Sequence, residues 1–187
     1  MNRFETREAK KSENWNGYKP TYKLLDDYSG LIGIAQNKTI SYGDGTLSTT
    51  VKMINSAVYE NYLSVGKLAN HLMAKTIDQT VFNFWHWVRK NIRYKYDKEN
   101  VEQVRTPQRL FFDGFGDCDC MTVFVVALAK CLRMKNIEGH IVTFKGRGEA
   151  SHIYPVIDGY VCDTVLSTFD EHPNNVMFEK TKKIKFL

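Results

Sequence analysis

The sequence predicts an α+β fold, in which helices come first along the chain and an antiparallel sheet follows. Apolar residues recur at helical spacing between residues 49 and 132, whereas residues 140–166 form short apolar segments separated by glycine turns. The 187 residues suit one domain, and the 43% hydrophobic and 25% charged residues are ordinary for a globular protein. Such a chain can bury a substantial core without disulfides.

The two ends of the chain differ in character from its centre. Residues 1–20 are polar and charged, and residues 176–187 are rich in lysine. We therefore expect an N-terminal arm, a single domain over residues 21–175, and a basic C-terminal tail. The net charge of +5 comes mostly from the ends. We interpret it as solvated surface and do not expect nucleic acid as a partner, because no basic helix or aromatic RNA-binding motif accompanies it.

Cysteine usage and hydropathy indicate the compartment. The N-terminus has no apolar core of the kind found in signal peptides, and no apolar run is long enough to span a bilayer. Two of the four cysteines are separated by one residue, a spacing that rarely closes a disulfide on itself. We therefore expect reduced thiols in a cytoplasmic protein that does not associate with a membrane.

The first elements are short strands and an interrupted helix. Residues 30–34 and 39–42 have the composition of strands, and Gly43-Asp44-Gly45 has that of a turn. From residue 49 to about 75 the apolar spacing predicts a helix, which Gly66 interrupts.

A second helix is predicted over about residues 79–92, with Thr76 or Asp78 as its cap. Its apolar face consists of Val81, Trp85, Val88 and Ile92. His86 lies between two tryptophans in this helix, and we interpret it as a packing or surface residue.

The third helix carries the strongest signal. Residues 121–132 are apolar almost all round, which predicts a helix buried on most faces that ends near residues 136–139. Strands are then predicted over residues 140–145, 151–157 and 160–166. Asp158-Gly159 joins the last two strands and is a strong hairpin signal.

Cys118 is the candidate nucleophile. It lies in the motif Gly-Phe-Gly-Asp-Cys-Asp-Cys, residues 114–120, at the predicted start of the third helix. Backbone N–H groups and the helix dipole favour a thiolate there, whereas Asp117 and Asp119 raise the thiol pKa. Most cysteines are inert and buried, but a core position rarely lies between two aspartates in a turn flanked by glycines.

His152 and Asp163 are the candidate partners of Cys118. The simplest register for the hairpin pairs Ile157 with Tyr160. It places Tyr154 opposite Asp163, and His152 shares the face of Tyr154. His152 and Asp163 are then diagonal neighbours, ~7–8 Å apart at Cα, which is close enough for their side chains to form a hydrogen bond. A slip of one residue would put them on opposite faces.

These residues resemble a known family. Gly116-Asp117-Cys118-Asp119 opening an apolar helix, followed by His152 on one strand and Asp163 on the next, resembles the transglutaminase-like superfamily. The likeness is greatest to small bacterial and phage- or prophage-associated members. Residues 88–97, followed by Thr106-Pro107, are similar to the same group. The resemblance covers about residues 79–166.

The resemblance implies a papain-like core, in which a helix bearing the cysteine packs on an antiparallel sheet bearing histidine and aspartate. It implies Cys118 as nucleophile, His152 as general base and acid, and Asp163 as the group that orients the imidazole. The implied protein is a cysteine peptidase or amidase that needs no cofactor or metal. It would act on a peptide, protein or amide through a thioester and transfer the acyl group to water or to an amine.

Two features of the implied site stay open. Many relatives carry a second acid where this chain has Cys120, so we assign no catalytic role to that position. The backbone N–H of Cys118 is the expected oxyanion donor, and Gln108, Tyr94 and Tyr96 are further candidates among which spacing does not choose.

Two alternatives belong to other classes of function. One is a non-catalytic binding or structural module of the same fold, for instance a phage-encoded component in the host cytoplasm or the virion. The other is a zinc site that uses Cys118, Cys120 and His152. We rank the zinc site last, because no second Cys-x-x-Cys or paired histidines complete four ligands.

Overall fold

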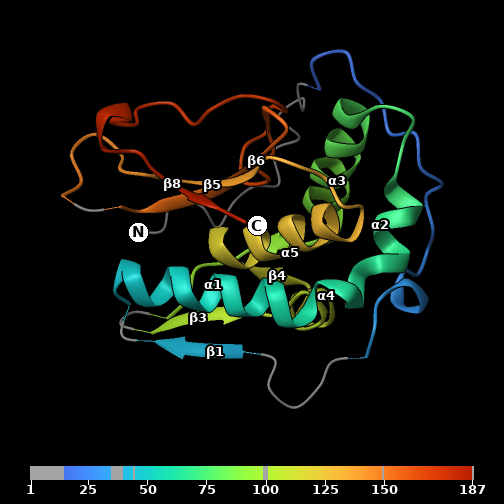
Figure 1. Cartoon of the computed structure of the whole chain (residues 1–187), viewed down its shortest axis with the longest axis horizontal. Coiled ribbons are helices and arrows are strands. Elements are labelled where there is room, and N and C mark those ends of the chain that lie inside the picture. Colours follow the sequence, from blue (N-terminus) through green and yellow to red (C-terminus); the bar gives the residue numbers. More distant parts are fainter. Residues whose placement is uncertain (1–14, 35–39, 44, 99–100, 149, 187) are drawn as a thin grey trace.

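The structure is a computed structural model and combines helices with a sheet in an α+β arrangement (Figure 1). Helix α5 lies at its centre, between the sheet that contains β5 and β6 on one side and helix α1 on the other (Figure 1). The described residues are 15–34, 40–43, 45–98, 101–148 and 150–186. The first fourteen residues of the expected arm and Asp44 of the expected turn lie outside them.

Five α-helices and three short 3-10 helices occur within the described residues. The α-helices are α1 (Leu47–Asn61), α2 (Gly66–Leu72), α3 (Ile77–Asn91), α4 (Pro107–Asp113) and α5 (Cys118–Cys131). The 3-10 helices are Ser29–Leu31, Tyr62–Val65 and Phe178–Lys180. The predicted helix over 49–75 is therefore interrupted by the 3-10 helix Tyr62–Val65, just before Gly66, which begins α2. The strand predicted at 30–34 is wrong, because the 3-10 helix Ser29–Leu31 overlaps it. None of the helices in the described residues has both the length and the apolar character needed to cross a membrane.

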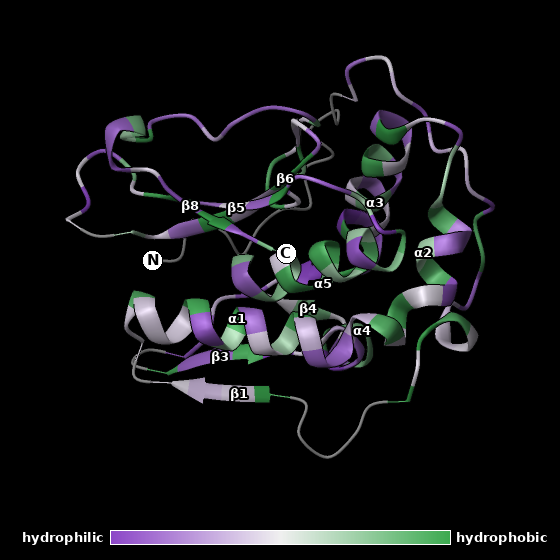
Figure 2. Ribbon diagram, viewed as in Figure 1, coloured by the Kyte–Doolittle hydropathy of each residue, from purple (hydrophilic) through white to green (hydrophobic). Residues whose placement is uncertain are grey.

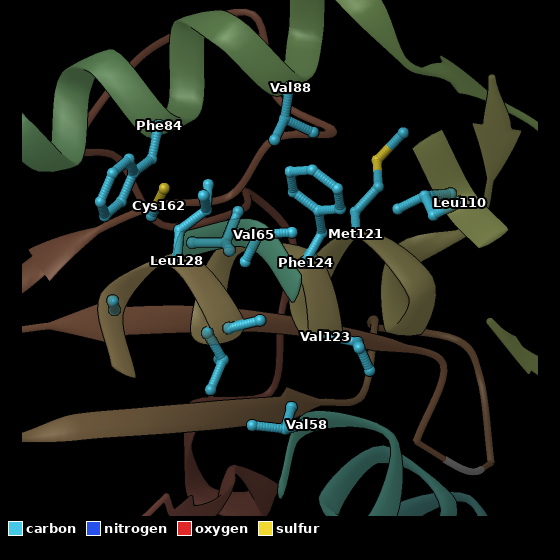
Figure 3. Close-up of a cluster of buried hydrophobic side chains, with 14 of the residues drawn as sticks. Val58, Val65, Phe84, Val88, Leu110, Met121, Val123, Phe124, Leu128 and Cys162 are labelled. Carbon is cyan, nitrogen blue, oxygen red and sulfur yellow. The ribbon is translucent and has the colours of Figure 1, made fainter. Parts of the chain in front are cut away.

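Helix α5 forms the centre of the hydrophobic core. Figure 3 shows its side chains packed against residues of α1, α3 and α4. The Trp87 ring of α3 stacks on Phe124 of α5, with ring centroids 5.4 Å apart. Helix α1, in contrast, alternates hydrophobic and hydrophilic residues along its length (Figure 2), because only one of its faces is turned towards the core. The prediction that the third helix is buried on most faces is confirmed.

The main sheet is antiparallel and has the strand order β7-β6-β5-β8. Its strands are β5 (Ile137–Val142), β6 (His152–Ile157), β7 (Tyr160–Val161) and β8 (Lys182–Lys185). Ile157 pairs with Tyr160, which is the predicted register. Asp158 and Gly159 between them have φ angles of 50° and 91°. Positive φ at both positions is typical of the tight hairpin turn that the Asp-Gly pair predicts.

The strand predicted over 160–166 is wrong beyond Val161. Pro155 has no N–H to continue the β6–β7 ladder, and the last rung is the Cys162 N–H bond to the Pro155 carbonyl at 2.9 Å. The chain then turns, because the Asp163 side chain accepts the Val165 N–H at 3.0 Å. Such a local side-chain bond competes with continued strand pairing.

The expected basic tail is instead part of the sheet. Strand β8 pairs with β5, and Phe186 beyond it is only 5% exposed. Ile184 lies between Lys183 and Lys185 of β8 and packs against Gly139 of β5. A lysine-rich composition therefore marks an exposed edge strand here, and the apolar residues between the lysines hold it in place.

The described part of the expected N-terminal arm also packs on the domain. The Trp15 and Tyr18 rings lie 6.1 Å and 5.3 Å from the ring of Phe82 in α3. The Tyr18 hydroxyl donates to Asp78 in the first turn of α3 at 2.9 Å. Residues 15–20 are therefore a covering segment of the core.

Two small sheets complete the fold, and one of them positions the site. Strand β1 (Ile40–Gly43) matches the strand predicted at 39–42, and it pairs with the unpredicted β3 (Glu102–Arg105). Strands β2 (Arg93–Tyr94) and β4 (Phe115–Gly116) form a parallel pair immediately before α5.

Candidate active site

The start of α5 is shaped by a close approach of α4. A Cβ on Gly116 would lie 2.6 Å from Leu110 of α4 and 2.9 Å from the Cβ of Cys120, so only glycine fits there without displacement. Asp117 follows as the extended N-cap, and its side chain accepts the Cys120 N–H at 3.5 Å. Cys118 is consequently the first residue of the helix, as the motif predicts.

Cys118 and His152 line one cavity of about 680 Å³. Cys118 is partly exposed, whereas Cys120 and Cys162 are buried. Helix α1 contributes an apolar wall with Leu47, Val51 and Ile54. The remaining charged groups of the lining are carboxylates near Cys118 and lysines near the start of β8; they are Glu102, Asp117, Asp119, Lys180 and Lys182.

His152 and Asp163 form a buried pair. The His152 Nε2 atom lies 2.7 Å from Asp163 Oδ2, and the two residues are 8% and 2% exposed. Asp163 is itself held in place, because its carbonyl accepts the Trp85 indole N–H at 2.9 Å. Its other carboxylate oxygen accepts the Val165 N–H. Since Nε2 is engaged, Nδ1 is the ring nitrogen of His152 that can serve a reacting thiol.

The Cys118 sulfur lies beside the start of β6. The Ile153 N–H donates towards it, and the Asp163 carboxylate is near enough for its charge to act on the thiol. The structure therefore gathers the three predicted residues at one place: Cys118 from α5, His152 from β6 and Asp163 from the turn after β7.

The electrostatics at Cys118 oppose ionisation. Burial raises the pKa of the Cys118 thiol well above its usual value, and the negative charges of Asp117 and Asp119 raise it further. The Ile153 N–H lowers this pKa, but it does not outweigh the other causes. Burial and these charges therefore favour the protonated thiol over the thiolate.

Carboxyl groups cluster behind the start of α5. Asp119 is 2% exposed, and within the part of the chain that the structure describes neither of its oxygens accepts a hydrogen bond from an N–H or hydroxyl group. Burial raises its pKa well above the usual value, and the adjacent Asp117 and Glu102 carboxyls, which can share its proton, act in the same direction. Burial and Asp117 likewise raise the pKa of Asp97 to about 6, although Arg105 opposes the shift.

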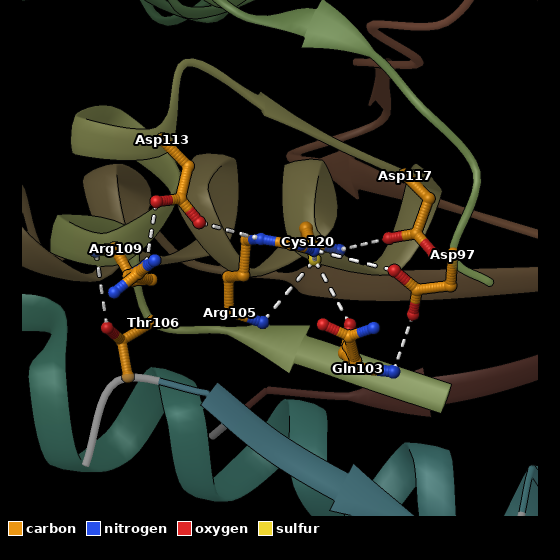
Figure 4. A network of polar contacts seen from close by, with 8 residues as sticks. All are labelled: Asp97, Gln103, Arg105, Thr106, Arg109, Asp113, Asp117 and Cys120. Carbon is orange, nitrogen blue, oxygen red and sulfur yellow. Dashed lines mark hydrogen bonds and ion pairs between the residues drawn. The ribbon is translucent and has the colours of Figure 1, made fainter. Parts of the chain in front are cut away.

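Arg105 connects this cluster to Cys120 (Figure 4). Its guanidinium lies 3.5 Å from Asp97 and 3.1 Å from Asp113, and its backbone N–H donates to the Cys120 sulfur at 3.3 Å. The Cys120 thiol donates in turn to the Gln103 carbonyl at 3.4 Å. Cys120 thus joins β3 to α5 and faces away from the cavity.

The zinc site suggested by the sequence is wrong, because its three ligands, Cys118, Cys120 and His152, do not form a cluster in the structure. Among the described residues, the metal-type cluster at this place contains Asp117, Asp119 and Cys120, whose ligand atoms lie within 4.8 Å of one another; it contains neither Cys118 nor His152. Residues two apart on a helix point in different directions, so Cys118 and Cys120 do not converge. The Arg105 guanidinium, 3.6 Å from the Cys120 sulfur, also disfavours a cation there.

The three further candidates for an oxyanion donor differ in their position relative to the cavity. Tyr94 and Tyr96 line the cavity, whereas Gln108 is buried in α4 and lies outside it. Sequence reasoning missed the α1 wall, Glu102 and the two lysines. These residues reach the cavity through contacts between distant segments, and no local motif marks them.

Comparisons with known proteins add one weak likeness. No family model matches the chain, and no curated protein matches it. The chain is similar to a solved structure of a protein from Cytophaga hutchinsonii named a "Putative Cysteine Protease", with 13% sequence identity and a TM-score of 0.47. The match covers 75% of this chain and 47% of the other, so this chain spans about half the length of that protein.

Proposed function

We propose that this protein is a cysteine hydrolase of transglutaminase-like type, a peptidase or amidase that acts through Cys118, His152 and Asp163. One observation carries the proposal. A buried His152–Asp163 pair with a 2.7 Å contact lies on the wall of the cavity that also exposes a thiol at a helix start. A nucleophile, a base and an orienting acid are the three parts that thiol acyl transfer requires.

The reaction begins with the substrate carbonyl against the Cys118 sulfur. The thiol proton passes to Nδ1 of His152 as the sulfur–carbon bond forms, because the raised thiol pKa leaves little resting thiolate. The tetrahedral intermediate collapses when the carbon–nitrogen bond breaks and the leaving amine takes the proton from His152. The product of this half-reaction is a thioester on Cys118.

The second half-reaction uses the same groups in reverse. His152 accepts a proton from water as the water oxygen attacks the thioester carbonyl, and it returns a proton to the departing sulfur. The Asp163 carboxylate accepts the Nε2–H of His152 and so holds the ring in place. It also stabilises the imidazolium that forms in both half-reactions. An amine in place of water gives acyl transfer, which is the close variant of the proposed reaction.

A screen with peptide and glutamine-amide libraries tests the proposal. We expect the wild-type protein to release amine or ammonia from at least one substrate and Cys118→Ala to release none. Cys131→Ala is the matched control, because Cys131 is partly exposed at the other end of α5 and does not line the cavity. Adding a primary amine separates transfer from hydrolysis. Turnover that survives in Cys118→Ala would show that this thiol is not the nucleophile.

Modification of the thiols gives an independent test that needs no substrate. We expect iodoacetamide to label Cys118 before Cys131 and Cys162, because Cys118 lines the cavity together with His152, which can take up its proton. Cys162 is fully buried, and Cys131 does not line that cavity. His152→Ala should slow the labelling of Cys118, since the base is lost. Equal and slow labelling of all thiols would contradict a reactive Cys118.

A further inference from the structure

We propose that the Tyr94 hydroxyl donates a hydrogen bond to the oxyanion that forms on the substrate carbonyl when Cys118 attacks, opposite the backbone N–H of Cys118. The inference rests on the proposed function and assigns it a further catalytic residue. A thiol protease or amidase needs two donors aimed at the developing oxyanion. The helix start supplies one of them, since the first N–H groups of α5 have no partner within the helix.

The β2–β4 pair places Tyr94 beside the nucleophile. Tyr94 pairs in register with Gly116, two residues before Cys118. The pair is closed by two bonds, from the Arg93 N–H to the Gly114 carbonyl at 2.9 Å and from the Lys95 N–H to the Gly116 carbonyl at 2.8 Å. The backbone of Tyr94 is therefore fixed to the same segment that begins α5.

The alternation of side chains along β2 directs Tyr94 into the cavity. Successive side chains of a strand point to opposite faces. Lys95 points outward, with its ammonium group 4.3 Å from the centroid of the Phe115 ring, whereas Tyr94 lines the cavity together with Cys118. The Tyr94 ring rests edge-on against Tyr96, with centroids 5.0 Å apart and an interplanar angle of 88°. The Tyr94 hydroxyl also shares a hydrogen bond with the Tyr96 side chain, so two contacts with one neighbour hold the half-buried ring at the cavity wall.

The protonation state of Tyr94 suits a donor. Burial raises the pKa of its hydroxyl far above the usual value, and the charges of Cys118 and Asp117 act in the same direction. These effects favour the protonated hydroxyl, which is the form that can donate a hydrogen bond. The influence of Cys118 on this pKa also agrees with a short separation between the two groups.

Other polar side chains in or near the cavity are less suitable than Tyr94 as the second oxyanion donor. Gln108 lies outside the cavity, and Tyr96 is 59% exposed and one pleat further from Gly116. Ser151 lines the cavity but is adjacent to His152. The leaving nitrogen must face His152 to receive its proton, so the carbonyl oxygen points to the other side. Tyr94 comes from the β2–β4 pair that precedes α5, whereas His152 comes from β6.

Tyr94→Phe, which removes only the hydroxyl, tests the assignment with p-nitrophenyl acetate as the acylating probe. We expect the Cys118-dependent release of p-nitrophenol to fall by about 10²-fold, with kcat lowered and KM little changed, as for loss of one oxyanion donor. Alkylation of Cys118 by iodoacetamide should keep its wild-type rate, because displacement at a saturated carbon forms no oxyanion. A purely structural role for Tyr94 would slow both reactions together.

Tyr42→Phe is the matched control, because Tyr42 is 66% exposed on β1 and does not line the cavity. Wild-type acylation rates in Tyr94→Phe would overturn the assignment and leave the proposed function intact. A parallel loss of alkylation would overturn it as well. If wild-type protein and Cys118→Ala release p-nitrophenol equally, the proposed function itself fails, and the role of Tyr94 fails with it.

Discussion

The Cys118 thiol is subject to two opposing electrostatic effects. It lies in the first turn of α5, where the helix dipole favours negative charge. Burial and the charges of Asp117 and Asp119 nevertheless raise its pKa well above the usual value. A fixed dipole acts with about half a unit charge, so an adjacent carboxylate outweighs it. We infer that the thiol loses its proton to His152 only as it reacts.

Asp117→Asn should make Cys118 more reactive at neutral pH. The amide oxygen can still accept the Cys120 N–H that Asp117 caps, so the helix start is kept while one negative charge is lost. We expect the rate of alkylation by iodoacetamide at pH 7 to rise about 3–10-fold, which corresponds to a decrease of the thiol pKa by roughly half a unit to one unit.

Asp119→Asn is the control for that experiment. The pKa of Asp119 is raised well above its usual value, so its carboxyl retains a proton when other carboxyls have ionised. Its replacement should change the alkylation rate less than Asp117→Asn does. An alkylation rate that is unchanged or lower in Asp117→Asn would show that this carboxylate does not control the thiol.

Among the secondary-structure elements, those with a strong local signal were predicted, whereas the short strands β2, β3 and β4 were not. Helices α3 and α5 and the Asp158-Gly159 turn follow from apolar period and turn chemistry. Strands β2 and β4 have only two residues each and exist because their partners are adjacent. The strand predicted over 160–166 ended early because Pro155 and Asp163 interrupt the ladder, an effect that alternation alone does not reveal.

The docking of β8 makes the C-terminal segment part of the stable fold, and Phe186→Ala tests this. Phe186 is 5% exposed, and its N–H donates to the Ile137 carbonyl of β5 at 2.9 Å. Truncating a buried phenylalanine costs about 3–5 kcal/mol, which for a domain of this size lowers Tm by roughly 6–20 °C. Circular dichroism during thermal unfolding measures the change.

Phe178→Ala controls for the loss of an aromatic ring in the same segment. Phe178 is 62% exposed, so its truncation should leave Tm nearly unchanged. Equal Tm values for Phe186→Ala and wild type would mean that the segment behaves as the solvated tail that its lysines suggest.

In the whole molecule, the site is assembled from segments that are far apart in the sequence. The expectation that Cys118, His152 and Asp163 lie together depends on a short motif and one hairpin. His152 and Asp163 are in contact although the β6–β7 ladder ends before Asp163. The cavity wall from α1 and the carboxyl cluster with Asp97 depend on tertiary packing. No local pattern in the sequence indicates that β1, β3 and α5 meet at Arg105 and Cys120.

The carboxyl cluster should also make the stability of the whole molecule depend on pH. The pKa of Asp97 is raised to about 6 and that of Asp119 is raised well above its usual value, both chiefly by burial. The unfolded chain therefore releases these protons at lower pH than the folded chain does. Their contribution to stability is complete below about pH 4, the unfolded pKa, and is lost as pH rises through the folded pKa values.

Asp119→Asn isolates this effect, because it removes one of the titrating groups. We expect its Tm to equal that of wild type near pH 4 and to exceed it at pH 7, because the buried carboxyl no longer has to stay protonated in the folded chain. Asp78→Asn should behave in the opposite way: the pKa of Asp78 is lowered by its hydrogen bonds, so its loss should lower Tm at pH 7 and have little effect near pH 3. A difference between Asp119→Asn and wild type that does not change with pH would show that Asp119 ionises alike in the folded and unfolded chains.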